Sequence, residues 1–161
     1  MKKAFTLIEI LIVVSILGIL SAIVFPEFQA HAQQSREAAA KDNLRILRNA
    51  IAVYAAQHND VPPGYQDSVL ISGADGIFIM TGQLKYTTDI NGNYSGDSYG
   101  PYLSELPENP MNQNKSILIL AEGDNFPTAT GLYGWIYDSA TKDIRMDYPG
   151  TDSEGIDYYS Y

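Results

Sequence analysis

The chain has 161 residues, a hydrophobic content of 45% and a formal net charge of −9 at pH 7. This length fits one domain with an appendage, and the apolar fraction is enough for a modest core. The absence of cysteine excludes disulfides and thiolate metal sites. Only four basic residues follow Arg48, so the C-terminal part is strongly acidic. Such a surface repels phosphate backbones, which argues against nucleic-acid binding, and it attracts divalent cations.

The N-terminus begins with an apolar run from Phe5 to Phe25, FTLIEILIVVSILGILSAIVF. As a helix this run spans about 31 Å, the thickness of the hydrocarbon layer of a membrane. Lys2 and Lys3 precede it, so the positive-inside rule places the N-terminus in the cytoplasm and the rest of the chain outside. The alternative is a cleaved signal peptide with an A-x-A site at residues 30–32. The run is longer than a usual signal peptide and continues into a patterned helix, which favours the membrane anchor.

One acid, Glu9, interrupts this run. A carboxylate at the centre of an isolated membrane helix costs about 2.5 to 3.5 kcal/mol, so an intramembrane acid is a functional candidate by default. Its natural partner is a cation in the same apolar layer. The run contains no lysine or arginine, so the cation must come from elsewhere.

Residues 2–28, KKAFTLIEILIVVSILGILSAIVFPEF, resemble the N-terminus of type IV pilins and of the pseudopilins of type II secretion. The resemblance implies that a prepilin peptidase cuts between Ala4 and Phe5 and methylates the new amine of Phe5. It implies an inner-membrane precursor that joins a homo-oligomeric filament, in the periplasm or on the cell surface, with an assembly platform and minor pilins as partners. Ala4 departs from the family, which usually has glycine at this position.

Cleavage before Phe5 would create the missing cation, because it frees the α-amino group of Phe5. Glu9 of one subunit could then pair with the amine of its neighbour. Such a pair at 4 Å is worth roughly 4 kcal/mol at an effective dielectric constant of 20. Because apolar helices slide freely past one another, a polar pair at one level fixes their axial register.

The helix is expected to continue to His58 and to stop at the Pro- and Gly-containing residues 59–64. Its second half predicts an apolar stripe that docks on the body of the chain, formed by Ala40, Leu44, Leu47, Ile51 and Tyr54 and broadened by Ile46, Ala50 and Val53. Gly18 and Pro26 are the weak points of the helix, and the sequence predicts a bend or a local opening between them. A simple proline kink is the alternative.

The C-terminal part is rich in Gly, Asn, Asp, Tyr and Pro and predicts loops around a small antiparallel sheet. Three strands are expected at Ser116–Ala121, Tyr133–Asp138 and Asp143–Tyr148, the last two joined in a hairpin by residues 139–142. The expected fold class is α+β and pilin-like, with the long helix on one face of the sheet. The predicted segments are a leader at 1–4, an apolar assembly helix at 5–26, an amphipathic helix at 27–58 and a globular domain at 59–161.

Two acidic loops are candidates for binding calcium, the only cofactor that the sequence suggests. Calcium wants six to eight oxygen ligands, and its binding would order a tail that has no disulfide. The tail offers the carboxylates of Asp147, Asp152, Glu154 and Asp157, and a weaker candidate set is Asp89, Asn91, Asn93 and Asp97. An acidic calcium loop is also what a resemblance to major pseudopilins implies. The alternative is that both loops are solvated turns.

Catalysis is not expected. Both histidines, His31 and His58, fall on the predicted helix, and none follows among the loops. A Ser-His-Asp arrangement would need one there. The function that the resemblance implies is a filament subunit, either of a surface type IV pilus or of a secretion pseudopilus, a choice that the sequence leaves open. The alternative from another class is a monomeric binding module, anchored or secreted, with calcium-ordered loops.

Overall fold

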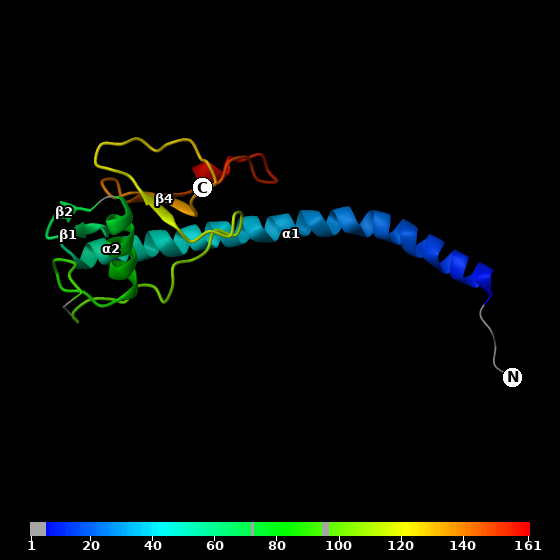
Figure 1. Ribbon diagram of the computed structural model, residues 1–161, viewed down its shortest axis with the longest axis horizontal. Coiled ribbons are helices and arrows are strands. Elements are labelled where there is room, and N and C mark those ends of the chain that lie inside the picture. Colours follow the sequence, from blue (N-terminus) through cyan, green and yellow to red (C-terminus); the bar gives the residue numbers. More distant parts are fainter. Residues whose placement is uncertain (1–5, 72, 95–96) are drawn as a thin grey trace. The chain divides into compact units, whose positions relative to one another are not determined.

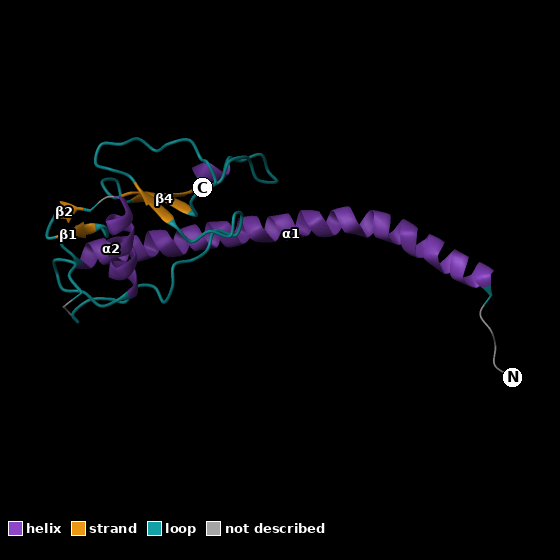
Figure 2. Cartoon of the chain, in the orientation of Figure 1, coloured by secondary structure: helices purple, strands orange, loops and turns teal. Residues whose placement is uncertain are grey.

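The structure is a computed structural model that describes residues 6–71, 73–94 and 97–161. Its elements, in chain order, are helix α1 (Leu7–Gln57), strands β1 (Tyr65–Gln66) and β2 (Val69–Leu70), helix α2 (Gly73–Lys85), strands β3 (Ile117–Ile119), β4 (Trp135–Asp138) and β5 (Asp143–Met146), and the short 3-10 helix η1 (Tyr158–Ser160), as Figure 1 and Figure 2 show. The chain divides into two compact units, Met1–Ser35 and Arg36–Tyr161. We call the second unit the body.

The first unit holds the apolar part of α1. Helix is assigned without a break through Gly18 and Pro26, so the predicted local opening between these residues is wrong for this structure. Pro26 has no backbone N–H and so removes one helical hydrogen bond, but the remaining hydrogen bonds keep this stretch helical. Ser15 donates its hydroxyl to the carbonyl of Leu11 at 2.7 Å, so this polar group in the apolar stretch has a partner on its own backbone.

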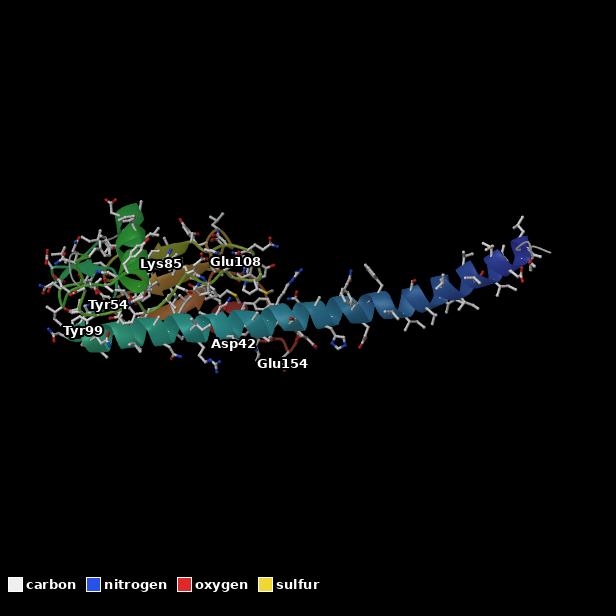
Figure 3. The ribbon with its side chains drawn as sticks, turned by 90° about the horizontal axis from the view of Figure 1, so that it is seen from below. Asp42, Tyr54, Lys85, Tyr99, Glu108 and Glu154 are labelled. Atoms are coloured by element: carbon white, nitrogen blue, oxygen red, sulfur yellow. The ribbon has the colours of Figure 1, made fainter. Side chains whose placement is uncertain are left out.

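In the body, α1 presents its predicted stripe to the core. Ala40, Leu44, Leu47, Ile51 and Tyr54 are all buried, which confirms this part of the prediction. Figure 3 shows Asp42 on the opposite side of the helix, away from the strands. The predicted broadening of the stripe is wrong at two positions, because Ile46 and Val53 are 45% and 48% exposed. The sheet is too narrow to cover more than one face of the helix.

The end of α1 matches the predicted stop. Asn59 and Asp60 take left-handed φ values of 54° and 67°, and the amide of Asp60 donates to the carbonyl of Ala55 at 2.8 Å. This is the hydrogen bond of a Schellman cap, and asparagine tolerates the left-handed conformation better than most residues. The prolines that follow cannot continue the helix.

The main sheet has the order β3-β4-β5. The antiparallel hairpin of β4 and β5 is confirmed, with Trp135 opposite Met146. Strand β3 runs parallel to β4, so the sheet is mixed and the prediction of a purely antiparallel sheet is wrong. The loop of residues 120–134 returns the chain to the start of β4 and makes the parallel pairing possible. Buried Trp135, Tyr137 and Ile144 pack with the α1 stripe in one core.

Two elements of the body were not predicted. Residues 65–70 form a two-stranded hairpin whose turn residues, Asp67 and Ser68, have φ values of 49° and 65°. Two successive positive values are typical of a type I′ turn. The other element is α2, which packs close to the end of the β1–β2 hairpin because Gly76 has no side chain: a Cβ there would lie 1.9 Å from the carbonyl oxygen of Ile71. Three glycines in α2 hide the helical pattern in the sequence.

Candidate assembly site

The start of α1 is capped by a reciprocal pair, Thr6 and Glu9. The backbone amide and the hydroxyl of Thr6 both donate to Oε2 of Glu9, at 2.8 and 2.6 Å. In return, the Thr6 hydroxyl accepts from the amide of Glu9 at 3.4 Å. This is a capping box, in which two residues three apart satisfy the free donors of a first helical turn. The T-x-x-E signature of this box stands in the sequence at residues 6–9, so Thr6 could have been predicted as the partner of Glu9.

The capping box gives Glu9 a role within one chain. A carboxylate near a helix N-terminus is also stabilised by the helix dipole. Thr6 therefore lowers the cost of keeping an acid in an apolar segment, and the carboxylate stays at the first turn of the helix. Ala4 and Phe5, the predicted cleavage and methylation residues, lie outside the described residues.

The apolar residues that follow Glu9 have no cover in the first unit. From Leu7 to Phe28 the large apolar side chains are between 51% and 85% exposed. Within the described residues, one helix is long and apolar enough to cross a membrane, and its most apolar window has a mean hydropathy of 2.8 with no buried residues. Gly18 has open space on its side-chain face. A surface of this kind needs lipid or other apolar helices around it.

Asp147 is buried and acts as an anchor for a loop. Its carboxylate accepts four hydrogen bonds from residues 130–133, among them the amides of Thr130 at 2.6 Å and Tyr133 at 2.9 Å. Burial raises the pKa of the Asp147 carboxyl, but these hydrogen bonds outweigh burial and hold that pKa below its ordinary value. Both oxygens are thus committed to protein donors.

Asp152 fixes the tail to α1. Its carboxylate accepts the Tyr161 hydroxyl at 2.6 Å and lies 3.4 Å from Nζ of Lys41. The hydrogen bond from Tyr161 is the main cause that lowers the pKa of Asp152 to about 2, with burial acting in the opposite direction and backbone amides adding to the decrease. The other two predicted tail ligands face solvent: Glu154 is exposed (Figure 3), and Asp157 caps η1 through the amide of Tyr159.

The loop of residues 89–94 is organised by its first acid. Oδ1 of Asp89 accepts the amides of Asn91 and Asn93, each at 2.9 Å, so the predicted oxygen ligand closes a turn. The side chain of Asn93 binds Gln66 and Asp67 of the first hairpin. Asp97 is exposed, and residues 95 and 96 lie outside the described part of the chain.

These contacts bear on the predicted calcium sites. In the part of the chain that the structure describes, no three histidines, cysteines or carboxylates come together as a group that could hold a metal ion. The arrangement of the tail does not fit a calcium site as it stands, because Asp147 and Asp152 would have to give up N–H and O–H donors to bind the ion. Calcium binding at either loop stays a prediction from the sequence.

Comparison with known families singles out the same N-terminal segment. The family model of the prokaryotic N-terminal methylation motif matches residues 1–25. This match contains the capping box and most of the uncovered apolar helix. It also contains the predicted cleavage position.

Curated relatives extend the likeness into the body. The chain is 48% identical over 49 residues to the type IV major pilin protein PilA of Myxococcus xanthus, which covers 30% of this chain and 22% of that protein. It is 35% identical over 65 residues to type II secretion system core protein G of Pseudomonas aeruginosa, covering 40% and 46%. It is 35% identical over 79 residues to the type IV major fimbrial protein FimA of Dichelobacter nodosus, covering 47% and 51%.

These matches cover about half or less of the length of those relatives. No solved structure matches the chain. The motif at residues 1–25 falls on the start of the long apolar helix α1. In its N-terminal segment, the chain carries the prokaryotic N-terminal methylation motif and is similar to type IV pilins and a type II secretion core protein.

Proposed function

We propose that the chain is the structural subunit of a helical filament, of the type IV pilus or type II secretion pseudopilus kind. A prepilin peptidase first cuts the inner-membrane precursor between Ala4 and Phe5, and an assembly platform then builds the filament with minor pilins. The observation that carries this proposal is a single carboxylate, Glu9, at the first turn of an apolar helix that nothing covers. The capping box alone would also serve a monomeric anchored module, so the role of the Glu9 charge in assembly is what the substitutions below test.

The proposed chemistry of assembly has two stages. In the precursor, the donors of Thr6 satisfy the Glu9 carboxylate, so the anchor can stay in the membrane as a single helix. Cleavage then adds a cation, the amine of Phe5, in the same apolar layer. The amine of an incoming subunit pairs with Glu9 of its neighbour, at a gain of roughly 4 kcal/mol for charges 4 Å apart at an effective dielectric constant of 20. Thr6 keeps the carboxylate at the level where that amine arrives.

The exposed apolar side chains of residues 7–28 make the pairing possible. Lipid covers them before assembly, and the helices of other subunits cover them afterwards. The bodies face outward, and their acidic surface keeps the filament soluble.

Two single substitutions separate the charge of Glu9 from its capping role. Glu9→Gln keeps an acceptor for the Thr6 amide, because glutamine also completes a capping box, but it removes the charge. Thr6→Val keeps the charge and removes the hydroxyl. We expect Glu9→Gln to abolish filaments, as judged by electron microscopy and sedimentation, and Thr6→Val to reduce them by a smaller factor. Normal filaments from Glu9→Gln would contradict the charge pair and leave only the cap.

Experiments on whole cells distinguish a surface pilus from a secretion pseudopilus. A surface pilus is recovered by shearing intact cells and is seen by electron microscopy, whereas a secretion pseudopilus stays in the periplasm and its loss blocks the export of secreted proteins. A chain that stays monomeric at all concentrations, in membranes and in detergent, would instead fit the alternative of an anchored binding module.

A further inference from the structure

The loop of residues 89–94 contains the dipeptide Asn91-Gly92, and the packing around it requires glycine at the second position. Gly92 is buried and has a left-handed φ of 81°. A Cβ at this position would lie 2.5 Å from Nε2 of Gln83 and 2.7 Å from the hydroxyl of Tyr54. Another residue type would therefore strain the backbone and displace both neighbours.

A glycine that follows an asparagine makes the pair chemically labile. Because no side chain shields it, the backbone nitrogen of Gly92 can attack Cγ of Asn91. A C–N bond forms, the nitrogen loses its proton, and the carboxamide nitrogen leaves as ammonia. Water then opens the resulting cyclic imide at one of its two carbonyls. The product is an aspartate, or an isoaspartate whose backbone runs through the former side chain and is longer by one methylene.

The side chain of Asn91 is the part of this pair that the fold leaves free. It is exposed, and among the described residues no hydrogen bond holds its carboxamide. The carboxamide can therefore rotate toward the Gly92 nitrogen without breaking a contact.

The nucleophile, in contrast, is restrained by Asp89. The Gly92 amide donates to the carbonyl of Asp89 at 3.1 Å, and Oδ1 of Asp89 accepts the amides of Asn91 and Asn93, each at 2.9 Å. The amide of Asn93 is the main cause that lowers the pKa of the Asp89 carboxyl, so this group is a carboxylate at neutral pH. A negative charge beside the Gly92 amide also opposes the loss of its proton.

The carbonyl of Gly92 is the contact that a longer backbone would disturb. It accepts from Nε2 of Gln83 at 3.1 Å. The fully buried Gln83 also donates to the carbonyl of Tyr65 at 2.6 Å and accepts the amide of Gly64 at 2.8 Å. Gln83 on α2 thus joins the loop to the start of the β1–β2 hairpin. A methylene inserted before Gly92 would move its carbonyl away from Gln83.

We propose that Asn91 is a modification site, at which the Gly92 nitrogen and water convert asparagine into aspartate and isoaspartate, and that the Asp89 turn suppresses this reaction in the folded body. The rate is then set by opening of the turn. The isoaspartate form loses the contact between Gly92 and Gln83, so the body weakens as the chain ages. This proposal does not depend on filament formation.

The rate of deamidation tests the role of Asp89. The purified full chain is incubated in detergent at neutral pH, and mass spectrometry of its peptides follows the gain of about 1 Da that replaces ammonia by water. We expect a slow gain at Asn91 in the folded chain and a faster one in denaturant. Asp89→Ala should raise the rate in the folded chain about tenfold, because it removes the carboxylate that closes the turn. Asp89→Asn keeps an acceptor and should raise the rate less.

The matched control is Asp97→Asn, which changes an exposed acid of the same segment and should leave the rate at Asn91 unchanged. Equal rates in the folded chain and in denaturant would overturn the proposal, and so would equal rates for Asp89→Ala and the parent chain. Faster modification at Asn93 than at Asn91 would overturn it as well. If Asp89→Ala does not fold, Asp89→Asn replaces it, and a rate equal to that of the parent then overturns the proposal.

The consequence for the body is tested on the modified chain. The isoaspartate form is separated by ion exchange through its added negative charge. Asn91→Asp carries the same charge on a backbone of normal length. We expect the isoaspartate form to melt at a lower temperature than Asn91→Asp. Equal melting of the two would overturn the proposed loss of the Gln83 contact.

Discussion

The carboxylate of Glu37 on α1 accepts a hydrogen bond from the hydroxyl of Tyr158 at 2.8 Å, across 121 residues of sequence. The same carboxylate accepts the hydroxyl of Ser153 at 2.8 Å, and Glu37 is only 5% exposed. This buried acid thus fastens the C-terminal tail to the helix without a disulfide. Because donors to a charged group contribute more than neutral hydrogen bonds, each of these contacts matters for the stability of the body.

Tyr158→Phe should destabilise the body. The change removes one hydroxyl donor from a buried carboxylate and keeps the ring packing, so we expect the free energy of unfolding to fall by about 1.5 to 3 kcal/mol. The fluorescence of Trp135, which is fully buried, reports unfolding of the full chain in detergent. Tyr86→Phe is the control, because Tyr86 is 61% exposed. Equal stability of Tyr158→Phe and the parent chain would show that the hydrogen bond from Tyr158 to Glu37 adds nothing to the stability of the body.

Asp152 should make the stability of the body depend on pH in the acidic range. Its pKa is lowered to about 2 in the folded chain, against about 3.9 for an unperturbed aspartate, so its contribution to stability is complete above about pH 5 and is mostly lost as the pH falls to about 2. Asp152→Asn should lower the melting temperature at pH 7 and flatten the decline between pH 4 and pH 2. A smaller decline of the melting temperature with acid should remain in Asp152→Asn, because the pKa of Asp147 is lowered as well.

The control for this pH dependence lies two residues away. Glu154 is an exposed carboxylate in the same loop, so Glu154→Gln should leave both the melting temperature and its decline in acid unchanged. Identical acid profiles for Asp152→Asn and the parent chain would mean that the contacts with Tyr161 and Lys41 add nothing to stability.

Gly76→Ala should destabilise the body although alanine favours helices. The helix preference of alanine gains about 1 kcal/mol, but the new Cβ would lie 1.9 Å from the carbonyl oxygen of Ile71, and overpacking of this kind costs about 1 to 3 kcal/mol or more. The clash is with backbone, so a side-chain rotation cannot relieve it. Gly18→Ala, where no atom lies within 4 Å, should leave the melting of the body unchanged. A rise in stability for Gly76→Ala would place α2 farther from the hairpin than the structure does.

The sequence predicted those parts of the fold that rest on strong periodicity or on turn chemistry. The stripe from Ala40 to Tyr54 and the hairpin of β4 and β5 came from spacing and from the polar turn at residues 139–142. Helix α2 was not predicted because glycines 76 and 82 lower its helix propensity. At these positions glycine instead allows close packing against Ile71 and Tyr94. The parallel pairing of β3 depends on where a long loop returns, which local sequence does not determine.

At the candidate site, sequence reasoning identified Glu9 but not the partner that it has within one chain. The charge of Glu9 predicts a cation as its partner, whereas within one chain the neutral amide and hydroxyl of Thr6 satisfy the carboxylate. The acids of the tail illustrate the opposite error. Asp147 and Asp152 were grouped as ligands by their closeness in sequence, whereas folding directs Asp147 to residues 130–133 and Asp152 to Tyr161 and Lys41.

The central claim is that removal of the leader creates the cation that Glu9 binds in a neighbouring subunit. The most direct test is the mass of the N-terminal peptide of subunits taken from purified filaments. The account predicts a peptide that starts at Phe5 and carries one added methyl group on its amine. Filaments whose subunits still begin with residues 1–4 would contradict it, because the amine would then lie outside the apolar layer that contains Glu9.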